Sequence, residues 1–307
     1  MPLVAHSPLP TFENLRHLGQ EILTLDHALR QDIRELHIGL LNMMPDAALT
    51  VTEQQFMRLL GSSNQIAQFY VYPFSIPGLP RSRETEAYIA EYYTTFEQLK
   101  RDGLDALVIT GANVANPTLE QESFWRPLQE VIAWATEDVT SVLCSCLATH
   151  ALVQQLYGIK RQRLPAKKWG VYPHHITQKE HPLLRNINTR FDVVHSRYNA
   201  ITRAQLEAAG LSILVESYEG GVHMAVSPDQ FRLVYFQGHP EYDFNSLLKE
   251  YKREVLRFVA GEIEEYPPHP ENYFPETAAA IANEYQAIVL ASQAANTPIP
   301  PFPEAAI

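Results

Sequence analysis

Cys146 occupies a position where a thiol could act as a nucleophile. Residues Val139–Leu143 form a β-branched apolar run, and from Leu147 the apolar residues fall at helical spacing, with no Pro or Gly between the two patterns. A buried strand is therefore expected to run directly into a helix, with Cys146 at the join. Free N–H groups and the helix dipole favour negative charge there, and the thiolate is the nucleophilic form of cysteine. This join resembles a nucleophile elbow, without the flanking glycines of the hydrolase motif.

Other interpretations of the two cysteines stay open at this point. Cysteine is among the most buried residue types, so Cys144 and Cys146 could both be core residues. A zinc site is disfavoured because the chain has only these two cysteines and lacks a tetrahedral set of ligands around them. A disulfide between residues two apart would be strained.

A second group of chemically active residues follows the apolar stretch Arg232–Gln237. Gly238 is followed by His239, and Glu241 comes two positions later. A nucleophilic thiol works with a base, and the base works with an orienting carboxylate, so Cys146, His239 and Glu241 could form a triad. The alternative for His239 is a surface histidine in a turn, with the glutamate capping the next helix.

The order of apolar patterns predicts an α/β fold. Strands are expected over 35–42, 66–73 and 103–111, and helices over 52–60, 82–99 and about 124–134, before the Cys146 strand. This alternation predicts a mostly parallel sheet flanked by helices, with a site at the carboxyl ends of the strands. A basic loop is expected over 160–168, followed by short strands at hairpin spacing that indicate an antiparallel part. We divide the chain into a covering arm (1–34), a single α/β domain (35–293) and a disordered tail (294–307).

Composition narrows the class of protein. The net charge is −11 with no Lys/Arg block, which disfavours binding to nucleic acid or an anionic membrane. No apolar run is long enough to span a bilayer, and two cysteines in a chain of this size are typical of a reducing compartment, so we expect a cytoplasmic protein. The dinucleotide-binding, P-loop and HExxH motifs are absent, and no metal or prosthetic-group site is visible.

Several ordered motifs resemble the homoserine O-succinyltransferase/O-acetyltransferase family of methionine biosynthesis. The resemblance extends from about Glu35 to Pro275. Its motifs are LLNMMP (40–45), TEQQFMRLLG (52–61), LVITGA (107–112), VTSVLCSCLATHALVQQLYGI (139–159), KKWGVYPHH (167–175), HSRY (195–198), GHPEYD (238–243), EYKREV (250–255) and NYFP (272–275). It implies a three-layer, flavodoxin-like fold related to the class I glutamine amidotransferases.

The resemblance also implies roles for individual residues. Cys146 matches the acylated nucleophile, His239 the general base and Glu241 its partner. The residues that match substrate-binding positions are Lys167, Ser196, Arg253 and Glu250. Independently, positions 250 and 253 share a helix face, so a carboxylate and a guanidinium could grip the ammonium and carboxylate of an amino acid. The implied substrates are an acyl-CoA and L-homoserine, with no cofactor, and the implied assembly is a homodimer.

The stabilisation of an acyl oxyanion and the choice of donor involve further positions. We expect the backbone N–H groups of Leu147 and Ala112 to form the oxyanion hole. In the family, the residue four after the Gly of the TGA turn is Glu with acetyl-CoA and Gly with succinyl-CoA, and here it is Ala115. Because alanine adds no carboxylate, succinyl-CoA is favoured and acetyl-CoA is the alternative.

Three alternatives remain beside this hypothesis. The family carries lysine soon after Met-Pro, whereas this chain has Asp46–Leu49, so L-serine is an alternative acceptor; one methylene contributes only about 1–3 kcal/mol to discrimination. A glutamine amidotransferase or related Cys hydrolase could use the same triad. The third alternative is a non-catalytic binding or regulatory relative that has lost the enzymatic activity.

Overall fold

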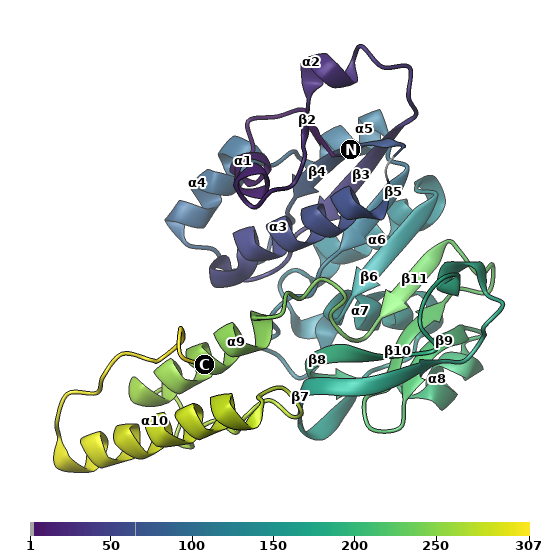
Figure 1. Cartoon of the computed structure of the whole chain (residues 1–307). Helices are drawn as coiled ribbons and strands as arrows, with labels where there is room; N and C mark the ends of the chain where they lie inside the picture. The colour runs from purple at the N-terminus through teal and green to yellow at the C-terminus, as the bar shows by residue number, and fades with distance from the viewer. Residues whose placement is uncertain (1–2, 65) are drawn as a thin grey trace.

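The computed structural model describes residues 3–64 and 66–307, and a twisted nine-stranded sheet lies at the centre of this part of the chain (Figure 1). Its strand order is β4-β3-β5-β6-β11-β10-β9-β7-β8, and β1 and β2 form a separate parallel pair. The strands are β1 (Val4–Ala5), β2 (Leu23–Thr24), β3 (Glu35–Leu41), β4 (Gln68–Phe74), β5 (Ala106–Ile109), β6 (Ser141–Ser145), β7 (Gln162–Ile176), β8 (Arg190–Ala200), β9 (Ser212–Ser217), β10 (Gly221–Val226) and β11 (Leu233–Phe236).

The sheet has a parallel half and an antiparallel half. Strands β4, β3, β5, β6 and β11 pair in parallel, whereas β10, β9, β7 and β8 pair antiparallel to their neighbours. The predicted α/β class, with a mostly parallel first part and antiparallel later strands, is therefore confirmed. The carboxyl ends of β6 and β11 lie side by side, because Ser145 pairs with Phe236 in register.

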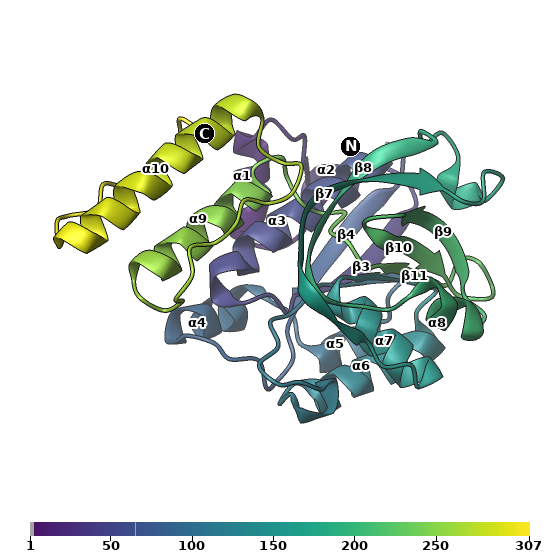
Figure 2. The same ribbon diagram turned by 90° about the horizontal axis from the view of Figure 1, so that it is seen from below.

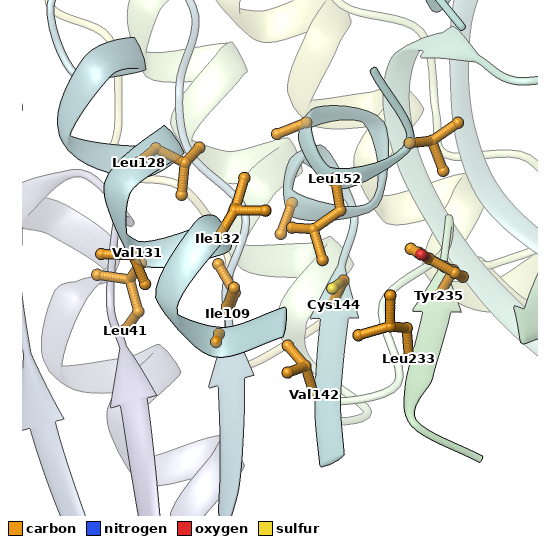
Figure 3. Close-up of a cluster of buried hydrophobic side chains, with 14 of the residues drawn as sticks. Leu41, Ile109, Leu128, Val131, Ile132, Val142, Cys144, Leu152, Leu233 and Tyr235 are labelled. Atoms are coloured by element: carbon orange, nitrogen blue, oxygen red, sulfur yellow. The ribbon is translucent and has the colours of Figure 1, made fainter. Parts of the chain in front are cut away.

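Helices cover both faces of the sheet (Figure 2). They are α1 (Pro10–His17), α2 (Leu25–Ala28), α3 (Asp46–Ser63), α4 (Arg83–Tyr92), α5 (Phe96–Asp102), α6 (Trp125–Asp138), α7 (Leu147–Tyr157), α8 (Arg203–Ala208), α9 (Ser246–Val259) and α10 (Glu276–Ala295), with 3₁₀ turns at Leu119–Gln121 and Pro182–Leu184. Alternate strand residues point to opposite faces, so Ile109 packs with α6 and α7 while Val108 packs with α3. Figure 3 shows the first of these cores, with Val142 and Cys144 directed toward Leu152.

Residues 3–34 lie over α3 and β4. Leu9, Phe12 and Leu15 are buried against Phe56 and Val71. On the same side of the sheet, α9 and α10 form a helical layer that packs on β7 and β8 (Figure 2). The buried face of α9 carries Leu247, Tyr251 and Val255 at helical spacing, which explains why this segment forms a strong amphipathic helix.

Three segments differ from the sequence-based expectations. The expected helix 82–99 is divided, because Tyr93 and Thr94 are extended against β4 and Thr95 caps a new helix. The expected loop 160–168 contains the start of β7, paired with β8 around an irregularity between Arg163 and Lys168. The expected disordered tail (294–307) instead continues α10 to Ala295 and then folds back, with Ile299, Phe302 and Ile307 packed in the α9–α10 core.

The described residues contain neither a membrane-spanning helix nor a cluster of metal-binding side chains. No helix among residues 3–64 and 66–307 is long and apolar enough to cross a membrane. The same part of the chain contains no cluster of three or more His, Cys, Asp or Glu side chains arranged to hold a metal ion.

Candidate active site

Cys146 lies on a sharp turn between β6 and α7, as the sequence predicts. It has φ 53° and ψ −109°, a conformation with positive φ that a residue other than glycine rarely adopts. Such backbone strain costs about 1–3 kcal/mol and persists only where the surroundings impose it. The turn holds a partly exposed Cys146 above the sheet, whereas Cys144 is fully buried among the core side chains. Burial raises the pKa of the Cys144 thiol, which makes it a poor nucleophile.

The end of β11 fixes the turn from the neighbouring strand. The N–H of Cys146 donates to the carbonyl oxygen of Phe236 at 2.8 Å, and the Thr149 hydroxyl donates to the same oxygen at 2.8 Å. Phe236 therefore anchors both the elbow and the first turn of α7. Three residues after this anchor, the chain reaches His239.

Gly238 allows His239 to approach the elbow. A Cβ at position 238 would lie 2.8 Å from both the Val194 carbonyl oxygen and the His223 Nδ1 atom. Real Cβ atoms do not approach non-bonded atoms this closely. The N–H of His239 donates to the same Val194 carbonyl at 3.0 Å. The glycine thus lets the chain pass directly over β8, and the next residue presents its imidazole to the site.

His239, Glu241 and Cys146 come together. Nδ1 of His239 lies 2.8 Å from Oε1 of Glu241, whose other oxygen accepts a 3.1 Å hydrogen bond from the Ser145 hydroxyl. Burial alone would lower the pKa of His239, but the Glu241 carboxylate and a side-chain contact with Cys146 raise it well above its usual range. The three side chains therefore form a series of thiol, imidazole and carboxylate.

A second polar cluster surrounds Glu250 on α9. Its Oε2 atom accepts a 2.7 Å hydrogen bond from the Ser196 hydroxyl and lies 3.3 Å from the Lys167 Nζ atom, and its Oε1 atom accepts from the Tyr242 hydroxyl. Burial acts to raise the pKa of Glu250, but the Lys167 ammonium and the two hydroxyl donors hold it below its usual value. Lys167 belongs to the four residues of β7 that lie between the paired positions Arg163 and Lys168, so this strand irregularity directs its side chain toward α9.

Among the remaining predicted site residues, Leu147 and Ala112 lie next to residues of the Cys146 turn, whereas Arg253 lies outside the Glu250 cluster. Leu147 is the first residue of α7, where the N–H has no partner within the helix. Gly111, next to Ala112, faces Cys146, because a Cβ there would lie 3.6 Å from the Cys146 Cβ atom. The structure does not bring Arg253 into the Glu250 cluster. Its side chain is 50% exposed and pairs with Glu254 at 3.1 Å.

Comparisons with known proteins bear on this geometry. Residues 2–288 match the family model described as homoserine O-succinyltransferase. The chain belongs to this family. It is 61% identical to the homoserine O-succinyltransferase of Methylobacter tundripaludum, over 100% of this chain and 87% of that protein, and 59% identical to that of Methylococcus capsulatus, over 99% and 86%. A glutamine amidotransferase from Thermotoga maritima has a similar fold, with a TM-score of 0.50 at 12% identity over 84% of this chain and 94% of that one.

Two residues at the site of this homoserine O-succinyltransferase family member were missed by the sequence analysis. Tyr242 stacks on His239 with ring centroids 4.2 Å apart, so it connects His239 to the Glu250 cluster. Its presence in the GHPEYD motif was a signal that could have identified it. The Met44 Sδ atom lies 3.6 Å from the position of a Cβ on Gly111, beside Cys146.

The altered segment after Met-Pro has an internal partner that the sequence did not reveal. Arg81, whose side chain is only 6% exposed, pairs with Asp46 at 3.4 Å and donates to the carbonyl oxygens of Asn42 and Met44. A positive charge is therefore present at this loop, but it comes from Arg81 and not from a residue after Pro45. The hydrogen-bond donors of Arg81 are used by Asp46 and by the carbonyl oxygens of the loop.

Proposed function

We propose that this chain transfers a succinyl group from succinyl-CoA to the side-chain hydroxyl of L-homoserine through an acyl-enzyme on Cys146. The observation that carries the proposal is the strained elbow at Cys146 with the His239–Glu241 pair beside it. The relatives at about 60% identity, which are described as homoserine O-succinyltransferases, support the choice of substrates.

The first step forms the acyl-enzyme. His239 takes the proton of the Cys146 thiol, and the sulfur attacks the thioester carbonyl of the acyl-CoA. The N–H groups of Leu147 and Ala112 would stabilise the negative oxygen of the tetrahedral intermediate. When that intermediate collapses, the bond to the CoA sulfur breaks, and CoA leaves with the proton from His239. Glu241 stabilises the imidazolium that exists between these two proton transfers.

The second step moves the acyl group to the amino acid. His239 accepts the proton of the homoserine hydroxyl, whose oxygen attacks the thioester carbon on Cys146. The Cys146 sulfur then leaves and regains the proton from His239, so the enzyme returns to its starting state and the product is an O-acyl ester. Because the same imidazole serves both steps, its contacts with Glu241 and Cys146 are central to the mechanism.

The Glu250 cluster would position the acceptor. Glu250 would bind the α-ammonium group, with Lys167, Ser196 and Tyr242 holding its carboxylate in place. Arg253, one turn further along α9, would bind the α-carboxylate after giving up its partner Glu254, since an ion pair with a half-exposed guanidinium contributes only about 0–1 kcal/mol. Stacking of Tyr242 on His239 places this cluster beside the base.

Ala115 would leave room for the longer donor. It lies in the loop that follows Gly111, and its N–H donates to Glu122 Oε1 at 2.9 Å. A glutamate at position 115 would place a carboxylate where the succinyl carboxylate is expected. Acetyl-CoA is the alternative donor and L-serine the alternative acceptor.

Steady-state CoA release, measured with each pairing of succinyl-CoA or acetyl-CoA with homoserine or serine, tests the proposal. We expect the highest kcat/KM for succinyl-CoA with homoserine. A preference for another pairing would revise the substrates but keep the chemistry. Glutaminase activity without acyl transfer would favour the second candidate function, a Cys hydrolase, which rests on the amidotransferase-like fold.

The homodimer and the cytoplasmic location are predictions from the sequence. Light scattering would test the homodimer, and cell fractionation would test the location.

A further inference from the structure

The segment between α7 and β7 lies against the loop that carries Ala115. Lys160 Nζ and Glu120 Oε1 are 2.7 Å apart, and the Arg163 guanidinium lies 4.6 Å from the centre of the Tyr198 ring on β8. Lys160 is therefore paired with Glu120, and Arg163 lies over the ring of Tyr198. Arg161 lies between them and is partly buried.

The loop 111–122 connects this segment to the nucleophile. Its first residue, Gly111, faces Cys146, with 3.6 Å from the position of a glycine Cβ to the Cys146 Cβ atom. At the other end, the buried carboxylate of Glu122 accepts hydrogen bonds from the N–H groups of Ala115 at 2.9 Å and Asn116 at 2.7 Å. Glu122 thus fixes the backbone at Ala115.

Arg161 follows Lys160, whose ion pair with Glu120 places it beside the loop that runs from Gly111, next to Cys146, to Glu122. Burial lowers the pKa of its guanidinium, and the charges of Cys146 and Glu122 act in the opposite direction. The charged groups around Arg161 act on it only through space, and it makes no side-chain hydrogen bond to the described part of the chain. Its five N–H donors are therefore available to a ligand.

The other cations near the site are already occupied. Arg197 is also within reach of Cys146, but it donates to His195 Nδ1 at 3.2 Å and to the carbonyl oxygens of Asn199 and Gly220 at 2.9 and 2.6 Å. Lys167 is paired with Glu250, and Arg81 with Asp46 and two carbonyl groups. Among the described residues, Arg161 is thus the cation near Cys146 that retains free donors.

We propose that Arg161 binds the distal carboxylate of a dicarboxylic acyl group carried on Cys146, and that Glu122 positions its guanidinium. This inference rests on the proposed acyl transfer. A planar guanidinium can bind a carboxylate through two parallel hydrogen bonds, which gives both affinity and orientation. Ala115 carries only a methyl group, so it adds neither bulk nor a carboxylate that would compete for Arg161. Arg161 would therefore determine donor specificity by attraction, and Ala115 by leaving space.

The test is the ratio of kcat/KM for succinyl-CoA to kcat/KM for butyryl-CoA, which has the same chain length but a methyl group in place of the carboxylate. In Arg161→Gln we expect this ratio to fall about 10- to 100-fold, as for the loss of hydrogen bonds to a charged group. Arg161→Lys should keep part of the preference, because it keeps the charge. The ratio is independent of the amount of folded enzyme, so partial misfolding does not affect it.

Arg163→Gln is the matched control, since Arg163 is two residues away and lies over Tyr198. Its ratio should equal that of the wild type. An unchanged ratio in Arg161→Gln, or an equal fall in Arg163→Gln, would overturn the role of Arg161 and leave the acyltransferase proposal standing. If the wild-type protein accepts neither acyl-CoA, the proposed function itself fails, and the role of Arg161 fails with it.

Discussion

Cys146 rests on an apolar core, whereas His239 rests on a layer of buried histidines. The residues below Cys146 include Ile109, Val142 and Leu152, which lie between the parallel strands and α6 and α7 (Figure 3). The residues below His239 come from the antiparallel half of the sheet. They are His174, His195, His223 and Arg197.

The two regions differ in how protonation affects them, because a layer of buried histidines lies below His239. His195 Nε2 lies 3.2 Å from His174 Nε2, and Nδ1 of His195 accepts a hydrogen bond from Arg197, so this ring is held neutral. Burial, and then neighbouring positive groups, lower the pKa of His223 to about 3. Apolar packing and the hydrogen bonds to Phe236 therefore hold Cys146, whereas the support of His239 also depends on uncharged histidines.

Cys146→Ala should have the largest effect, because it removes the proposed nucleophile without disturbing the core. Turnover should fall by about 10⁴-fold or more, as for other nucleophile deletions, while urea unfolding stays close to the wild type. Cys144→Ala is the matched control, two residues away in the same core, and should keep its kcat within a few fold. If both variants behave alike, the assignment of the nucleophile is wrong.

Glu241→Gln should have the next largest effect, because it removes the negative charge that raises the pKa of His239. We expect kcat to fall by about 10²- to 10⁴-fold and the pH profile of kcat/KM to shift. Glu262→Gln, at an exposed position on the protein surface, serves as the control and should leave both unchanged. A normal kcat in Glu241→Gln would show that His239 works without a carboxylate partner.

Acid should destabilise the antiparallel half through its buried histidines. In the unfolded chain His223 titrates near 6.5, but in the folded protein its pKa is about 3, so below pH 6.5 the unfolded state binds more protons. The stability contribution is complete above pH 6.5 and is lost as pH falls toward 3, by about 2 kcal/mol at pH 5 for this one residue.

Urea unfolding of His223→Gln at pH 7 and pH 5 measures that contribution. The loss of stability between the two pH values should be smaller by about 2 kcal/mol than in the wild type. His17→Gln, whose ring is 75% exposed, should show the wild-type pH dependence. An equal pH dependence in all three proteins would mean that the histidine layer does not cause the acid sensitivity.

Arg253→Ala should have the smallest effect. Because its guanidinium is half exposed and pairs with Glu254, its loss should raise KM for the acceptor by about 10-fold, equivalent to one charge-assisted hydrogen bond, with little change in kcat. Arg257→Ala, one turn further along α9, also removes a partner of Glu254 and should not change KM. An unchanged KM in Arg253→Ala would remove Arg253 from the substrate site.

The parallel half was predictable from the sequence because its signals are local. The β-branched run before Cys146 and the helical spacing after it are sufficient to predict the elbow. The run 103–111 likewise predicts β5, since strands buried on both faces are continuously apolar. The structure then brings the three predicted triad residues together, because β6 and β11 are neighbours in the sheet.

The parts that were not predicted depend on contacts between distant segments. Lys167 reaches Glu250 through an irregularity in β7 that only its pairing with β8 defines. Residues 294–307 resemble a disordered tail in composition, but the Tyr285 hydroxyl donates to the Pro300 carbonyl oxygen at 2.8 Å and Lys252 pairs with Glu304. Sequence periodicity contains no information about either contact.

The most direct test of the account is intact-protein mass spectrometry after mixing with succinyl-CoA in the absence of an acceptor. We predict that the protein gains the mass of one succinyl group, that the modified peptide contains Cys146, and that addition of homoserine removes the label. Cys144→Ala should acquire the same label and Cys146→Ala should not. A label that survives in Cys146→Ala, or rapid turnover by a wild-type protein that never becomes labelled, would contradict covalent transfer through Cys146.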